Sequence, residues 1–302
     1  MLKKSYDILC TQNRLVVYRF IDENKEALGL RWLLRKLKVS SCAYYNYKKK
    51  RNTKRVEQKM KICKAINEIY DNHNGLIGYR TMTIFLARRG IHLSTPTVHK
   101  YMNKELKLYS AKSYKKTIRK KAEPTCIFRN ILKQNFSAYA KNIVWCTDFT
   151  TITLSGGSRR FNCSVIDLYD RTVVASTNSS HMNSDLAITT IKKAIEQEKP
   201  PKGLILHSDR GSQFTSSEFI NFCKDYGIIQ SMSEAGCPYD NAPMERFYNT
   251  LKKELVYPGS FSSDSQFDKA LGDYVFVWYN KIRPHSYNNG LTPYQTRYMI
   301  AN

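Results

Sequence analysis

The apolar pattern of the chain changes near Asn142, and this change constrains the fold more than any other feature. Before it, apolar residues recur at helical spacing; after it, short β-rich runs come first and then alternate with helical stretches. We predict strands at 143–151, 161–166, 172–177, 203–207 and 228–232, and helices at 184–198, 216–226, 242–255 and 265–281. The order β-β-β-α-β-α-β-α predicts an α/β fold, with a mixed five-stranded sheet flanked by helices.

The N-terminal part is predicted to be all helical. Residues 22–50 resemble two short helices around a turn, and residues 56–72 form a further helix. Residues 78–108 fit a helix–turn–helix more clearly, because Gly90 can end the first helix while Thr95 and Pro96 can begin the second. The second helix of such a pair can enter a DNA major groove, although an ordinary αα-hairpin has the same pattern. Candidate DNA contacts here are Tyr79, Arg80, Thr97, His99, Lys100 and Lys104.

The net charge of +24 is concentrated in the first half of the chain. Residues 1–125 contain 30 Lys and Arg against 9 Asp and Glu, whereas residues 126–302 contain 19 against 16. Such a balance predicts a polyanionic partner, either nucleic acid or an anionic membrane surface. Interleaved Tyr and Arg and the lack of a long amphipathic helix favour nucleic acid. The basic stretch 110–123 is either a solvated tether or a strip that follows phosphates.

Three acidic residues stand in distinctive local sequences after Asn142. Asp148 lies inside the first apolar strand, where a carboxylate is costly unless something compensates it. Asp209 ends the fourth strand, just before Gly211, and Glu245 lies in the first turn of a helix. Each also has a plain structural reading: a solvent-facing strand residue, a turn residue, or an acid favoured by the helix dipole.

The helix of Glu245 gives the acidic residues a common context. Asn249 and Lys252 follow Glu245 by four and seven residues, so the three share one helical face, where a DNA phosphate could pass. Three converging carboxylates repel one another unless cations neutralise them. Their oxygen-only chemistry favours two Mg²⁺ (or Mn²⁺) ions over zinc, a pair that can drive phosphodiester chemistry.

Three longer segments carry a family resemblance: HSDRGSQFTS, SMSEAGCPYDNAPMERFYNTLKKELVY and WYNKIRPHSYNNGLTPYQ. They resemble the second-reading-frame protein (OrfB) of IS-three family insertion-sequence transposases, in the DDE group related to retroviral integrases. The resemblance covers about residues 70–300 and implies an RNase H-like catalytic domain preceded by a helix–turn–helix. It also implies that the catalytic, metal-binding Asp, Asp and Glu are Asp148, Asp209 and Glu245, with Lys252 as the basic residue after them.

Further residues near these motifs are candidates for DNA contact. Ser212 and Gln213 could line the groove beside Asp209, and Asn241 could steer a scissile phosphate. Arg283 and His285 follow the last predicted helix, where they either pack against its end or contact DNA. The eight cysteines lack the spacing of a zinc module, so we expect no structural zinc.

The predicted domains are a helical, helix–turn–helix-like region (1–54), a helix–turn–helix DNA-binding domain (55–109), a basic linker (110–138), the catalytic core (139–258) and a C-terminal helical extension (259–302). The expected function is a two-metal DNA transposase that acts on terminal inverted repeats and target DNA. A catalytically idle DNA-binding regulator and an RNase H-type nuclease are the alternatives. The expected partners include further copies of the chain, as a dimer or larger oligomer, and the upstream-frame (OrfA) protein. We expect a bacterial cytoplasmic, nucleoid-associated protein without a membrane span.

Overall fold

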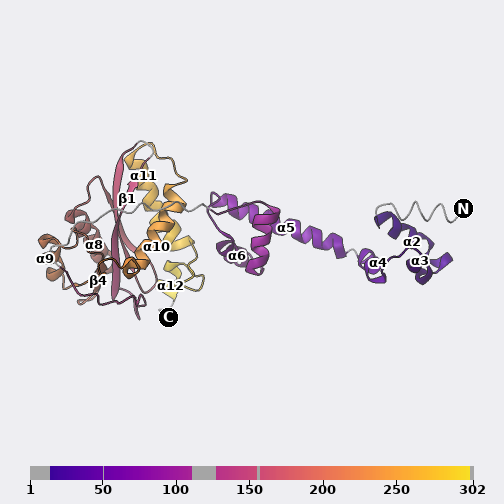
Figure 1. Ribbon diagram of the computed structural model, residues 1–302, viewed down its shortest axis with the longest axis horizontal. Helices are drawn as coiled ribbons and strands as arrows, with labels where there is room; N and C mark the ends of the chain where they lie inside the picture. The colour runs from indigo at the N-terminus through magenta and orange to yellow at the C-terminus, as the bar shows by residue number, and fades with distance from the viewer. Residues whose placement is uncertain (1–13, 50, 111–126, 155–156, 300–302) are drawn as a thin grey trace.

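The computed structural model describes residues 14–49, 51–110, 127–154 and 157–299. Three units follow one another along the long axis of the molecule (Figure 1). A small helical unit lies at one end, a second helical unit lies in the middle, and a larger α/β unit forms the other end. The first strand of the α/β unit begins at Val144, close to Asn142, where the apolar pattern of the sequence changes.

The first unit consists of α2 (Arg14–Leu28), α3 (Leu30–Lys36) and α4 (Ser41–Lys48). Its small core contains Ile21, Leu33 and Tyr44, each almost fully buried. Asp22 accepts hydrogen bonds from Lys25, Lys48 and Tyr44, and so joins α2 to α4. The predicted turn between two short helices is present, and α2 begins earlier than predicted.

The second unit is the predicted helix–turn–helix. The long α5 (Arg51–Asn72) packs on α6 (Tyr79–Arg88), and α7 (Thr95–His99) continues into the π-helical segment η1 (Lys100–Glu105). Gly90 has a φ of 76°, a conformation that glycine adopts without strain, and the first helix ends there as predicted. The second helix begins at Thr95, one residue earlier than predicted, since Ser94 rather than Thr95 occupies the N-cap position.

The α/β unit contains one five-stranded mixed sheet with the order β3-β2-β1-β4-β5. β1 pairs antiparallel with β2 and parallel with β4, so it lies at the centre of the sheet. The five strands are β1 (Val144–Thr153), β2 (Arg159–Asp167), β3 (Val173–Ser179), β4 (Ile205–Ser208) and β5 (Ile229–Met232). The predicted fold class is therefore confirmed, and the strand ends lie within two residues of the predicted ones.

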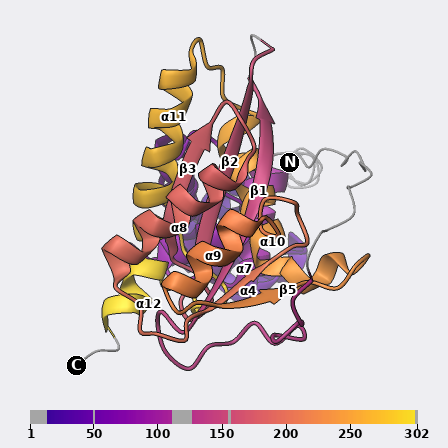
Figure 2. The same cartoon turned by 90° about the vertical axis from the view of Figure 1, so that its left-hand side faces the viewer.

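Helices cover both faces of this sheet (Figure 2). α8 (Ser184–Glu198) and α9 (Ser217–Asp225) bury one face around Trp145, Ile191 and Phe219. The other face packs against α10 (Ala242–Leu251), α11 (Asp264–Asp273) and the π-helical segments η3 (Lys252–Val256) and η4 (Tyr274–Ile282). Two of the predicted long helices thus change from α to π geometry partway along. A final helix, α12 (Pro293–Met299), lies within the predicted C-terminal helical extension, although its bounds were not predicted.

Part of the predicted linker packs on the α/β unit. The side chains of Asn130 and Gln134 both donate to the carboxylate of Asp240, and the backbone N–H of Ile131 donates to Ser231. Packing on the core therefore begins before residue 139, where the core was predicted to start. Most of the predicted basic linker lies outside the described residues.

The second unit also packs on the α/β unit, through an aromatic contact. Trp278 of η4 packs against a hydrophobic core of the α/β unit and against the core of the helix–turn–helix unit. The ring of His73 lies 4.8 Å from the ring of Trp278 and 4.7 Å from the ring of Phe85. Arg88 adds two long hydrogen bonds to the carbonyls of Ile282 and Gly290. These contacts fix the helix–turn–helix beside the end of η4.

Candidate active site

The register of β1 and β4 brings together the strand segments that lead to two of the three predicted carboxylates. Cys146 pairs with His207 in this parallel ladder, and two further residues along each strand lead to Asp148 and Asp209. Neighbouring strands lie about 5 Å apart, so these residues follow the last paired positions as neighbours. Both are half-buried. The sheet thereby provides the adjacency that sequence alone could only suggest.

A tight turn holds Asp209 directly after β4. The backbone N–H of Gly211 donates to its Oδ1 at 2.9 Å. A Cβ added to Gly211 would lie 2.9 Å from that same oxygen and 2.9 Å from Oε1 of Gln213, closer than such contacts allow. A side chain at position 211 would therefore displace the Asp209 carboxylate or the Gln213 amide, which accounts for the glycine after Asp209.

Two side chains hold the helix of Glu245 against the strand of Asp148. The hydroxyl of Tyr248 donates to the backbone carbonyl of Asp148 at 2.7 Å, and Nδ2 of Asn241 donates to that of Thr147 at 3.2 Å. Glu245 lies between these anchors, three residues before Tyr248. The third carboxylate is thus on a helix fixed against β1 at Asp148.

Two polar residues lie at the start of α10. Asn241 occupies the N-cap position but makes no side-chain cap hydrogen bond, and its Nδ2 donates to the backbone carbonyl of Thr147. Asp240, the residue before it, accepts the backbone N–H of Glu234 at 2.8 Å together with the side chains of Asn130 and Gln134. These bonds lower the pKa of Asp240, most strongly through the Glu234 N–H. Both residues therefore help to fix α10 in place.

The metal-ligand geometry is less complete than the sequence predicted. Within the ranges that the structure describes, no three or more His, Cys, Asp or Glu side chains are grouped so that they could hold a metal ion. Asp148, Asp209 and Glu245 nevertheless supply the hard oxygen donors that Mg²⁺ and Mn²⁺ prefer. The donor chemistry fits such an ion, while the gathering of all three carboxylates around it stays a prediction.

The predicted DNA-facing residues of α10 lie at its C-terminal end. Phe247 and Leu251 are buried, and Asn249 and Lys252 are half-buried. Lys252 is the first residue of η3, so the helix widens where that side chain begins. Beyond β4, Ser212 is exposed and Gln213 half-buried, both beside Asp209.

Arg283 and His285 occupy packing positions. Nε of Arg283 pairs with Glu254 at 3.1 Å, and Glu254 also accepts hydrogen bonds from Tyr274 and Trp278. His285 is 7% exposed, and its ring meets the ring of Tyr279 edge to face at 4.5 Å. Of the two roles left open by the sequence, this geometry favours packing at the end of η4.

His285 predicts a loss of stability in acid. Burial lowers the pKa of its imidazole from 6.5 to about 3, so the folded protein holds it neutral. The unfolded chain binds a proton first; stability should therefore fall as the pH drops from about 6.5 towards 3, by roughly 5 kcal/mol in all. Urea unfolding from pH 7.5 to 4.5 should show a shallower decline for His285→Gln than for the parent. Equal slopes for the two proteins would contradict this assignment.

The predicted recognition surface of the helix–turn–helix is open to solvent. Arg80, His99, Lys100 and Lys104 are exposed, while Tyr79 and Thr97 are half-buried. The ring of Tyr79 packs edge to face against His99 at 4.8 Å, which joins the start of α6 to the end of α7. DNA contact by these six residues stays a prediction.

Sequence reasoning missed Tyr248 and Glu254. Tyr248 is 5% exposed, and its hydroxyl donates to the backbone carbonyl of Asp148 in β1, with the carbonyl of Asn162 as a second acceptor. Its spacing from the apolar residues was the available signal, since Tyr248 follows Met244 by four residues and precedes Leu251 by three, on the buried side of α10. Glu254 lies in the π-helical segment η3, whose geometry the spacing did not predict.

Comparisons with known proteins agree with this architecture. Two family models described as "Integrase core domain" match residues 138–238 and 226–293, and one described as "HTH-like domain" matches residues 57–116. A transposase for insertion sequence element IS904 of Lactococcus lactis is 33% identical over 238 residues, covering 78% of this chain and 93% of that protein. InsK for element IS150 of Escherichia coli is 30% identical over 279 residues, covering 92% and 97%.

Solved structures give a weaker likeness. The catalytic core domain of HTLV-2 integrase in complex with magnesium is 22% identical, with a TM-score of 0.41, and the match covers 53% of this chain and 99% of that one. Among the helices described, none has the length and apolar character needed to cross a membrane.

Proposed function

Because the chain belongs to the IS-three (IS3) family of insertion-sequence transposases, we propose that it cleaves DNA strands at the ends of an insertion sequence and transfers the freed 3′-hydroxyl into DNA. We assign this chemistry to Asp148, Asp209 and Glu245. The observation that carries the proposal is the β1–β4 register, which leads to Asp148 and Asp209 as neighbours. The Tyr248 hydrogen bond supports Glu245 as the third member.

The three carboxylates would hold divalent cations, Mg²⁺ or Mn²⁺, with two ions per active site. Such ions activate a hydroxyl or water nucleophile and stabilise the leaving oxygen in phosphodiester chemistry. Asn249 and Lys252, on the same helix as Glu245, would position the phosphate next to the carboxylates. Ser212 and Gln213 would line the opposite side of the groove, and Asn241 would act mainly by fixing α10.

We further propose that double-stranded DNA binds along the basic units that precede the core. Residues Arg80, His99, Lys100 and Lys104 present exposed cationic or imidazole groups on one helix–turn–helix. Joining two element ends requires two active sites, so we propose a dimer or larger oligomer on DNA. An upstream-frame (OrfA) partner would add further end recognition.

The function is tested by strand transfer. The chain alone, given pre-cleaved element ends, a target plasmid and Mg²⁺, should yield joined products that EDTA abolishes. A catalytically idle regulator would bind the ends and give no product under the same conditions. An RNase H-type nuclease would cleave an RNA–DNA hybrid faster than it processes the terminal inverted repeat, so both substrates are compared side by side.

A further inference from the structure

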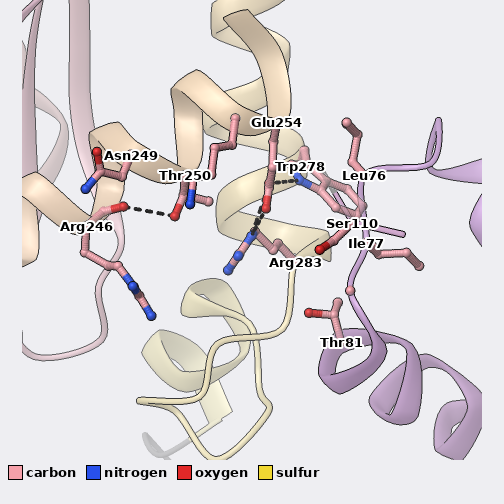
Figure 3. A pocket seen from close by; sticks show the side chains of 12 residues that line it. Leu76, Ile77, Thr81, Ser110, Arg246, Asn249, Thr250, Glu254, Trp278 and Arg283 are labelled. Carbon is pink, nitrogen blue, oxygen red and sulfur yellow. Dashed lines mark hydrogen bonds and ion pairs between the residues drawn. The ribbon is translucent and has the colours of Figure 1, made fainter. Parts of the chain in front are cut away.

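A polar cleft separates the helix–turn–helix from the helix that carries Glu245 (Figure 3). Its volume is about 280 Å³. Arg246, Asn249 and Thr250 of α10 form one wall with Glu254, Trp278 and Arg283. Leu76, Ile77, Thr81 and Ser110 of the helix–turn–helix unit form the other wall. The cleft thus connects the predicted recognition unit with the predicted catalytic helix.

The cleft carries positive charge that no carboxylate among the described residues neutralises. Among its described lining residues the one carboxylate, Glu254, is already paired with Arg283. Arg246 is exposed and Lys253 is half-buried, and neither forms an ion pair within the described ranges. Both line the cleft, which leaves two cations available for an anionic ligand.

A second cavity continues the first around α10. Its volume is about 310 Å³, and it shares Arg246, Thr250 and Arg283 with the cleft. It adds Arg171 and His285 to the lining. Each of these two residues has one buried nitrogen, Nη1 and Nε2 respectively, without a hydrogen-bond partner in the part of the chain that the structure describes. Unsatisfied buried polar atoms of this kind call for a partner such as an anion or a water.

The spacing of residues along α10 and η3 links the basic lining of the cleft to the candidate active site. Arg246, Thr250 and Lys253 lie at i, i+4 and i+7, one residue on from Glu245, Asn249 and Lys252. Asn249 belongs to the row of Glu245, which it follows by one turn, and it also lines the cleft. Arg246 and Lys253 lie about 10 Å apart along the helix, the axial length of about three nucleotide steps.

We propose that this cleft binds the sugar-phosphate backbone of the element end, on the stretch between the base pairs that the helix–turn–helix contacts and the bond that is cleaved. Arg246 and Lys253 each pair with a phosphate, and the backbone passes over Asn249 to Glu245. The proposal rests on the proposed function for the identity of the DNA. Cations that contact only phosphates contribute affinity and position rather than sequence readout.

The test measures the salt dependence of DNA binding in EDTA, so that catalysis plays no part. The variant is Arg246→Gln with Lys253→Gln, and the matched control is Lys192→Gln with Lys193→Gln on α8, an exposed pair on a helix that packs on the opposite face of the sheet. Loss of two phosphate contacts should make the slope of log K against log salt shallower by about 1.8. Affinity should fall on the order of tenfold per contact. The control variant should keep both the salt dependence and the affinity of the parent.

A second measurement separates direct contact from an indirect effect. Neutral methylphosphonates replace successive phosphates of the duplex between the repeat and the cleavage site. They should weaken binding by the parent chain at two or more positions and leave the double variant unaffected there. Equal slopes for variant and control, or equal methylphosphonate effects on parent and variant, would overturn the proposal. Because binding is read without metal, a chain that proved catalytically idle would leave this result intact.

Discussion

An Asp209→Asn chain is expected to bind element-end DNA like the parent and to lose cleavage and strand transfer by about 10³-fold or more. The substitution removes one negative charge from a set of ligands that would hold divalent ions. Such ions contribute several kcal/mol of charge stabilisation in phosphodiester chemistry, and about 1.4 kcal/mol corresponds to each factor of ten in rate. The size of the loss therefore tests the role of this carboxylate directly.

The fold should tolerate this change. Oδ1 of Asp209 accepts the Gly211 N–H at 2.9 Å, and an asparagine at this position keeps an oxygen that can accept the same bond. The matched control is Asp225→Asn at the exposed end of α9, which removes the same charge away from the site. Cleavage is followed on a labelled terminal repeat with Mg²⁺, and binding is followed in EDTA. Cleavage by the Asp209→Asn chain at a rate close to that of the control would refute the assignment of the triad.

The order of elements and the fold class were predictable because they depend on local patterns. Alternating apolar runs predicted the strands, and Gly90 and Pro96 marked the helix–turn–helix boundary. The position of Asp209 at a strand end followed from the same pattern. These features are encoded by residues close together in the chain.

The adjacency of Asp148 and Asp209 was not predictable from spacing alone. It depends on the parallel register of β1 and β4, which joins residues about sixty positions apart. Register is selected by packing of whole strands, so a local sequence does not reveal it. The role of Tyr248 depends on the same long-range fit, because its acceptor lies on another element. The family resemblance, rather than the spacing, indicated that the three carboxylates belong together.

The C-terminal end of the chain shows what local patterns leave out. The sequence predicted a helical extension there, and nothing in it marked Arg297 as a buried residue. Its guanidinium is 3% exposed and reaches Asp167 at 3.0 Å, Asp170 at 2.7 Å and Glu198 at 2.5 Å. A further bond joins it to Asn142 at 2.7 Å. One arginine thereby ties α12 to the start of β1 and to the ends of β2 and α8.

Replacing Arg297 with Met is expected to lower the free energy of unfolding by about 3–5 kcal/mol. Removal of the cation leaves Asp167 and Asp170 buried without their partner, and an uncompensated buried charge is costly. The matched control is Arg160→Met, whose partners Asp264 and Asp268 are 48% and 37% exposed. Solvent screens these two ion pairs, so their loss should lower the free energy of unfolding by no more than about 1 kcal/mol. Urea unfolding at pH 8 compares the two variants.

The pH dependence of this loss identifies its cause. Burial raises the pKa of Asp167, and removal of Arg297 should raise it further because a favourable charge is lost. A carboxyl with a raised folded-state pKa stabilises the fold when it is protonated, so the Arg297→Met chain should recover part of its deficit as the pH falls from 8 to 5. A cavity left by the shorter side chain would give a deficit that does not change with pH. A deficit equal to that of Arg160→Met, or one independent of pH, would show that the buried charges are not what Arg297 stabilises.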